Sequence, residues 1–106
     1  MSHDTIEGGP DRLQELTPDV TRALNQLRKT AYAEGVLPSR IKIGVGLAIS
    51  AAIRCEPCIE GYARSAAKSG LSEDELVELL NVVMTMQGCA GQPWARKALA
   101  AFERST

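Results

Sequence analysis

The chain has 106 residues, of which 12 are basic and 13 acidic, so its formal net charge is −1. This balance gives no overall attraction to nucleic acid or to an anionic membrane surface. The length suits one small domain. Hydrophobic residues make up 44% of it and aromatic residues only 4%, a composition of small aliphatic side chains that favours closely packed helices.

Residues 1–9 are polar and are expected to form a flexible leader before Pro10. They lack the apolar segment of a secretory signal. The longest uncharged run, residues 43–53, is shorter than the ~20 apolar residues that span a bilayer. We therefore expect a cytoplasmic protein with no membrane or nucleic-acid partner, in which residues 10–106 form a single helical domain.

Two helices are predicted before residue 35. The first starts near Pro10. The second has Thr17 as its N-cap, Pro18 at its first position and an acid, Asp19, in its first turn. Its apolar residues are spaced by four, three and four positions, which is one stripe of a helix that runs to about Ala33. The leucines of the first helix are Leu13 and Leu16, and the stripe of the second is Val20, Leu24, Leu27 and Ala31.

Residues 39–54 carry two conflicting signals. Their first half alternates apolar with small or polar residues, which is the periodicity of a strand. No other segment alternates in this way, so a strand here would lack a partner, and the second half suits a buried helix. We predict a helix over residues 39–54, capped by Ser39, in which Gly44 and Gly46 let a neighbouring segment approach closely.

Three further helices are predicted. One begins with Pro57 at its first position, runs to Ser69 and stops at Gly70. The next opens with a capping box of Ser72 and Glu75 and ends near Gly88, and the last opens at Gln92-Pro93. The fold class is therefore all-α, a bundle of five to six helices. Self-association is expected, because a domain of this size covers its apolar surface poorly. The residues expected on the apolar faces are Leu76, Leu79, Leu80, Val83, Met84, Trp94, Ala98, Leu99 and Phe102.

Cys55 and Cys58 are the most informative local feature. At this spacing two thiols can close a small disulfide ring and undergo reversible two-electron redox chemistry. The start of a helix favours the thiolate, through its unpaired amide groups and its dipole, and so does Arg54, whereas Glu56 and Glu60 oppose it, so the sequence does not give the sign of the net effect. Three interpretations stay open: a working dithiol, two small buried residues at a helix junction, and part of a metal site. Zinc would need two further ligands, for which one chain offers only Cys89 and His3.

Tyr62 and Glu60 are the candidate acid–base residues beside the cysteines. Tyr62 follows Cys58 by four residues and so shares its helical face, where the phenol can donate a hydrogen bond to a thiolate. Its reference pKa near ~10 makes it a poor proton acceptor at neutral pH. Glu60 is the best substitute base within reach, although with Glu56 it also suits an exposed face. The predicted site is Cys55, Cys58, Glu60 and Tyr62, without cofactor or metal.

Several segments of the chain carry a family likeness. They are residues 53–62, residues 66–72, Glu75 with Leu79, and the turn at residues 86–91, followed by a helix with Ala98 and Leu99. These segments resemble the carboxymuconolactone decarboxylase and alkylhydroperoxidase D-like family, over roughly residues 13–102 and most specifically over 53–72. The resemblance implies an all-α fold that forms homo-oligomers, often trimers or hexamers. In the redox-active branch it implies a CxxC that reduces peroxides and is re-reduced by a dithiol partner.

Two positions depart from the family pattern. The family places a His four residues after the second cysteine, where this chain has Tyr62, and its redox branch places a Glu about a dozen residues before the first cysteine, where this chain has Ile43. In the family both residues belong to a proton relay. His3, in the predicted leader, is a poor replacement. The chain is therefore predicted to be either a weak or rewired oxidoreductase or a relative that kept only the fold.

The leading hypothesis is a thiol-disulfide oxidoreductase of alkylhydroperoxidase type. The thiolate of Cys55 or Cys58 attacks a peroxide, and the other cysteine condenses with the sulfenic acid to form a disulfide. The alternatives are a non-catalytic helical scaffold and a lactone decarboxylase, for which the missing His removes the expected acid–base group. The expected partners are further copies of the chain, a dithiol reductant protein and a peroxide substrate. Cys89 is expected to be a small turn residue rather than a resolving thiol.

Overall fold

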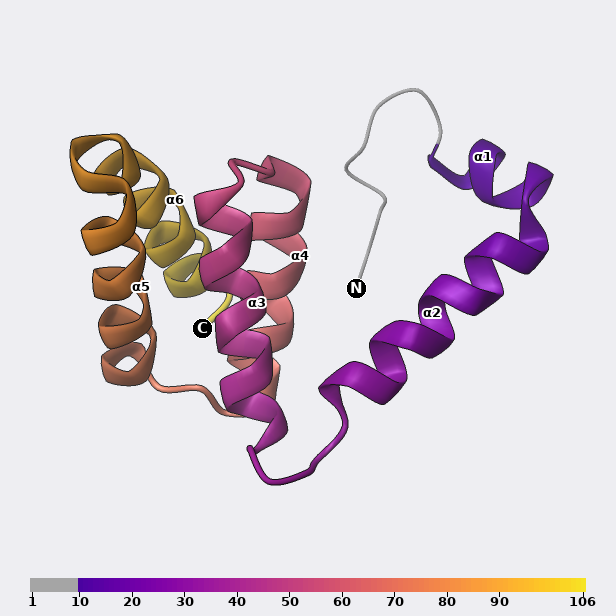
Figure 1. Cartoon of the computed structure of the whole chain (residues 1–106), viewed down its shortest axis with the longest axis horizontal. Helices are drawn as coiled ribbons and strands as arrows, with labels where there is room; N and C mark the ends of the chain where they lie inside the picture. Colours follow the sequence, from indigo (N-terminus) through magenta and orange to yellow (C-terminus); the bar gives the residue numbers. More distant parts are fainter. Residues whose placement is uncertain (1–9) are drawn as a thin grey trace.

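The computed structural model describes residues 10–106, and over this range all regular structure is helical, as predicted (Figure 1). The predicted leader, with His3, lies outside the described residues. The elements in chain order are α1 (Pro10–Leu16), α2 (Pro18–Tyr32), α3 (Ser39–Ala52), α4 (Glu56–Ser69), α5 (Glu73–Gln87), the short 3₁₀ helix η1 (Gly88–Ala90) and α6 (Gly91–Arg104).

Helices α3 to α6 pack side by side and form the body of the molecule (Figure 1). Their core consists mainly of leucine and alanine side chains, so the helices approach one another closely, as the composition predicts. None of the described helices is both long and apolar enough to cross a membrane. The most deeply buried core residues are Leu47, Ala51, Ile59, Ala63, Ala66, Leu76, Ala98, Ala101 and Phe102.

Helices α1 and α2 form an arm that leads away from this body (Figure 1). No residue of α2 is buried. The predicted apolar stripe of α2 exists, but it faces away from the protein: Val20, Leu24 and Leu27 are 65%, 44% and 62% exposed. The α2 helix meets the body at its last residue, Tyr32, which contacts Tyr62 of α4.

Local capping signals locate several helix ends correctly. The Ser72 hydroxyl accepts from the Glu75 amide and the Glu75 carboxylate accepts from the Ser72 amide, both at 3.0 Å, which confirms the capping box. Gly70 ends α4 in the left-handed region, with φ of 88°, where glycine is favoured over other residues. The Thr17 hydroxyl donates to the Leu13 carbonyl instead of capping α2.

Other boundaries differ from the prediction by one or two residues. The N-cap of α3 is Pro38, so Ser39 is the first helical residue and not the cap. Helix α3 ends at Ala52 and not at residue 54, because the chain turns sharply before the cysteines. Helix α4 begins at Glu56, one residue before Pro57, and α6 begins at Gly91, just after η1.

Helix α3, whose sequence carries both strand and helix signals, is helical throughout. Its two glycines, Gly44 and Gly46, contribute to the strand-like alternation of apolar and small residues because neighbouring side chains leave no room for a larger residue there. A Cβ atom at Gly44 would lie 2.9 Å from Leu79 Cδ1. A Cβ at Gly46 would lie 2.8 Å from Tyr32 Oη and 2.9 Å from Tyr62 Cε1. The prediction of close approach at both glycines is therefore confirmed, and Gly46 makes room for two tyrosines.

Candidate functional site

The turn between α3 and α4 holds the first cysteine in place. The Cys55 amide donates to the Ser50 carbonyl (3.0 Å) and the Arg54 amide donates to the Ala51 carbonyl (3.1 Å), which is the hydrogen-bond pattern of a Schellman motif. Arg54 occupies the left-handed position of this motif with φ of 60°, where glycine is usual. Such backbone costs an L-residue roughly 1–2 kcal/mol, so the turn is held by the structure around it.

Cys55 and Cys58 form a disulfide at the start of α4, with Cα atoms 5.2 Å apart. Both side chains are half-buried. Cys55 is the N-cap of α4, and its sulfur accepts a hydrogen bond from the Cys58 amide (3.4 Å). This is the position where a serine or aspartate oxygen usually caps a helix. The sulfur of Cys55 therefore lies at the positive end of the helix dipole.

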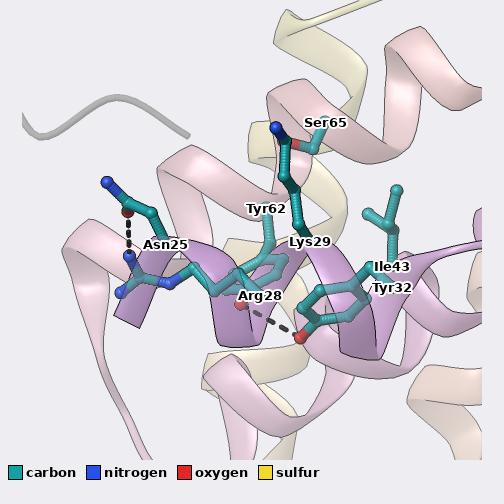
Figure 2. Close-up of a pocket in the computed structure, with 7 residues that line it drawn as sticks. All are labelled: Asn25, Arg28, Lys29, Tyr32, Ile43, Tyr62 and Ser65. Atoms are coloured by element: carbon teal, nitrogen blue, oxygen red, sulfur yellow. Dashed lines mark hydrogen bonds between the residues drawn. The ribbon is translucent and has the colours of Figure 1, made fainter. Parts of the chain in front are cut away.

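Tyr62 lies on α4 one turn beyond Cys58, and it is paired with a tyrosine from α2. The hydroxyl of Tyr32 donates to that of Tyr62 at 3.0 Å, and the ring centres are 5.6 Å apart (Figure 2). Burial, together with this hydrogen bond, raises the pKa of Tyr32 to about 12, so Tyr32 stays protonated at neutral pH. Sequence reasoning missed Tyr32, because it is thirty residues from Tyr62 and no local spacing links the two.

The two tyrosines border a cavity of about 290 Å³ between α2 and the body. Ile43 also lines this cavity (Figure 2). The two positions where the family resemblance implies relay residues therefore both line this cavity, but they hold an aliphatic side chain and a phenol. The residues that line the cavity are Asn25, Arg28, Lys29, Tyr32, Ile43, Tyr62 and Ser65.

Glu60 is placed away from this cavity. It is two residues from both Cys58 and Tyr62, so the helix turns it to the opposite side of α4. There its carboxylate accepts from Arg104 of α6 at 2.6 Å, and Glu56 pairs with Lys97 of α6 at 2.9 Å. Both carboxylates therefore connect α4 to α6. The role of Glu60 as a base stays a prediction, and this placement gives it no direct path to the thiols.

Two further features considered from the sequence are Cys89 and a metal site. Cys89 is an exposed free thiol in η1, which agrees with a turn residue. In the part of the chain that the structure describes, no three His, Cys, Asp or Glu side chains come together as a metal site. Gln87 of α5 donates to the Ala52 carbonyl at 2.7 Å, which fixes the end of α3 just before the cysteine turn.

Comparison with known proteins identifies the fold. The family model of the carboxymuconolactone decarboxylase family matches residues 18–102. The chain belongs to this family. The match includes the cysteine turn, both tyrosines, α3 to α5 and most of α6, and it confirms the family resemblance.

Two solved members of the carboxymuconolactone decarboxylase family have the same fold. The apo structure of a family protein from Legionella pneumophila aligns with a TM-score of 0.85 and 25% identity, over 90% of this chain and 85% of that one. A family protein from Thermotoga maritima, described as a candidate for a role in the antioxidative response, aligns with a TM-score of 0.71 and 26% identity, over 89% and 86% of the two chains.

Two similar sequences carry no assigned activity. A protein of Paracoccus denitrificans, described as uncharacterized protein 4 in the cox locus, is 31% identical over 73% of this chain and 69% of its own length. A Cupriavidus necator protein described as uncharacterized protein H16_B0147 is 28% identical over 86% of this chain and 80% of its own length. Function must therefore be argued from the site.

Proposed function

We propose that this family member is a cytoplasmic thiol-disulfide oxidoreductase that reduces hydroperoxides with Cys55 and Cys58. The observation that carries the proposal is the disulfide at the start of α4, in which the Cys58 amide donates to the sulfur of Cys55. The antioxidative role considered for the Thermotoga maritima relative agrees with it. The carboxymuconolactone decarboxylase reaction is less favoured, because Tyr62 stands where the family His would act as acid or base.

The chemistry needs only the two thiols, a hydroperoxide and a dithiol reductant. A thiolate attacks the distal oxygen of the hydroperoxide, the O–O bond breaks, and an S–O bond forms. Sulfur is oxidised to a sulfenic acid and the leaving alkoxide takes a proton to become an alcohol. The second thiol displaces water from the sulfenic acid and closes the disulfide. A dithiol, itself oxidised to a disulfide, then restores both thiols.

Cys55 is the better placed nucleophile. Its sulfur caps α4, so the Cys58 amide and the helix dipole stabilise negative charge on it and favour the thiolate once the disulfide is reduced. The adjacent Arg54 adds positive charge. Within the described part of the chain no amide donates to the sulfur of Cys58, which takes the role of the resolving thiol and condenses with the sulfenic acid.

The proton chemistry is the weak part of this site. Tyr62 can donate to a developing alkoxide, but a phenol cannot usefully accept the thiol proton at neutral pH. Its neighbour Tyr32, with its pKa raised to about 12, cannot accept it either. The proposal therefore includes slow turnover compared with an enzyme that has a His at this position.

Counting free thiols by mass spectrometry tests the proposal directly. The reduced chain has three thiols, and a stoichiometric dose of hydroperoxide should leave one, Cys89, while dithiothreitol should restore all three. In a Cys89→Ser background, Cys58→Ser should accumulate a sulfenic acid on Cys55 that a dimedone probe traps. The reverse variant, Cys55→Ser, should react more slowly.

Two results would reject the proposal. If hydroperoxide leaves all three thiols free, the disulfide has no role in peroxide reduction and the non-catalytic scaffold is favoured. If the wild type goes directly to sulfinic acid, Cys55 and Cys58 do not act as a dithiol. Trapping on Cys58 instead of Cys55 would reverse the assigned roles and leave the dithiol mechanism in place.

A further inference from the structure

The cavity beside Tyr62 has an unbalanced charge. Arg28 and Lys29 of α2 both line it, and none of its described lining residues is acidic. Within the described residues neither side chain forms an ion pair, and the side-chain hydrogen bond of Arg28 is to the Asn25 side chain, at 3.3 Å. Figure 2 shows the guanidinium of Arg28 beside Asn25, while the side chain of Lys29 points toward Ser65. Two positive charges therefore border one small space, and no carboxylate among the described residues lines it to neutralise them.

The hydroxyl groups of the cavity add hydrogen-bond donors. Tyr62 Oη accepts from Tyr32, so its own hydrogen is free to bind another acceptor. Tyr32 remains protonated, and Ser65 has a third hydroxyl at the cavity wall. Asn25 adds a polar amide to the lining, and Ile43 and the two tyrosine rings supply its apolar part. Cations and hydroxyl donors beside an apolar wall suit an organic anion better than a hydrated inorganic one.

We propose that this cavity binds the carboxylate of a small organic acid, with Arg28 and Lys29 as its cationic partners and Tyr62 as a donor. At about 290 Å³ the cavity holds a ligand of roughly the size of a benzoate-like or short-chain acid. No relative described above assigns a ligand to these residues.

This site deepens the proposed function by naming a substrate class. Tyr62 is four residues from Cys58, about 6 Å along the same face of α4. A ligand whose carboxylate is held by Arg28 and Lys29 can therefore extend past Tyr62 toward the cysteines. This substrate class rests on the proposed function. The preferred substrate is a hydroperoxide that carries a carboxylate: its carboxylate binds in the cavity, and its peroxide group meets the thiols.

Binding can be measured without turnover on the oxidised protein. Isothermal titration of the disulfide form with benzoate should show one saturable site, while benzyl alcohol and inorganic phosphate should bind at least tenfold more weakly. The double variant Arg28→Gln/Lys29→Gln should weaken benzoate binding at least tenfold. The matched control is Arg22→Gln, an exposed arginine on the same helix that pairs with Asp19 and does not line the cavity.

Steady-state kinetics then test the substrate class. The double variant should raise KM for a carboxylate-bearing aryl hydroperoxide at least fivefold and leave KM for neutral cumene hydroperoxide unchanged. No benzoate binding at millimolar concentration, or binding unaffected by the double variant, would overturn the inference. Phosphate binding as tight as benzoate would overturn it too.

The two proposals fail separately. Benzoate binding without peroxide-dependent loss of thiols would keep the carboxylate site and reject the peroxidase. Peroxide-dependent disulfide formation without benzoate binding would keep the peroxidase and reject the carboxylate site.

Discussion

At the scale of single residues, the site combines a suitable pair of sulfurs with an unusual set of proton donors. The Cys58 amide and the N-terminus of α4 favour negative charge on the sulfur of Cys55. The side chain one turn beyond Cys58, however, is the phenol of Tyr62. Tyr62 is held by Tyr32 in the space that Gly46 leaves open. The site therefore favours a thiolate and can donate a proton, while no described residue beside the cysteines is placed to remove one.

Replacing Tyr62 by His should increase the rate of peroxide reduction. An imidazole, with a reference pKa near ~6.5, can take the thiol proton near pH 7, whereas the phenol cannot. General acid–base catalysis contributes typically ~10²–10⁴-fold, and Ile43 at the position of the family Glu should limit the gain to about tenfold or somewhat more. The measurement is peroxide consumption by both proteins with the same dithiol in excess.

Two controls belong with this variant. Tyr62→Phe removes the hydroxyl and keeps the ring, so it separates proton transfer from packing against Tyr32. Glu60→Gln should change the rate little, because Glu60 is paired with Arg104 on the other side of α4. A rate lost in Glu60→Gln and unchanged in Tyr62→His would mean that Glu60 is the base after all.

At the scale of elements, one carboxylate fixes the starts of two helices. Glu75 closes the capping box of α5 with Ser72 and also accepts two hydrogen bonds from Arg40 of α3, at 3.0 and 3.3 Å. The hydrogen bonds from Arg40 are the main cause that holds the pKa of Glu75 below its ordinary value, and the bond from the Ser72 amide adds to it. The charged form is therefore the one that stabilises the contact between α3 and α5.

The stability of the fold should consequently fall on acidification through this group. Because the pKa of Glu75 is lower in the folded state, its contribution is present above the unfolded value of about 4.3 and is lost as pH falls below it. Urea unfolding between pH 7 and pH 3 should show a smaller acid-induced decrease for Glu75→Gln than for the wild type. Glu78→Gln, an exposed residue of the same helix, is the control. Equal pH dependence in all three proteins would contradict the prediction.

At the scale of the whole molecule, the apolar stripe of the α2 arm is exposed to solvent. A helix of 15 residues is marginally stable alone in water, and α2 buries none of its residues. A second apolar surface is open on the body, where α3 and α5 border a cavity of about 310 Å³. The exposed aliphatic residues around it are Val45, Ile49, Val82 and Met86.

We propose that the protein self-associates and that the stripe of α2 is covered by another copy. Each large aliphatic side chain that becomes buried contributes about 1.5–3 kcal/mol if it was fully exposed before. Light scattering at micromolar concentration should therefore give a mass well above the 11.4 kDa of one chain. The variant Leu24→Ser/Leu27→Ser should shift the mass toward the monomer.

Substitutions on the other face of α2 control for effects on the helix itself. Gln26→Ser/Thr30→Ser changes two exposed polar positions, so it should keep the oligomer. A wild-type mass of 11.4 kDa would contradict self-association. An oligomer that survives in the leucine variant would place the interface elsewhere.

The sequence by itself determined the features that depend on neighbours within a few residues. The capping box of Ser72 and Glu75, the left-handed Gly70 and the CxxC at a helix start are all local hydrogen-bond or covalent patterns, and each is found where it was expected. Two of the boundaries missed by one or two residues, the end of α3 and the start of α4, lie where the chain turns between these helices, since Arg54 adopts a backbone that its residue type does not suggest.

Only the tertiary structure decided which distant side chains meet. Tyr32 joins Tyr62 above Gly46, and Glu60 pairs with Arg104 of α6. The stripe of α2 faces solvent, although its spacing is the same as that of a core-facing helix. Periodicity shows that a helix has an apolar face, but it does not show what covers that face. That depends on the path of the chain between α2 and α3 and on packing across the whole fold.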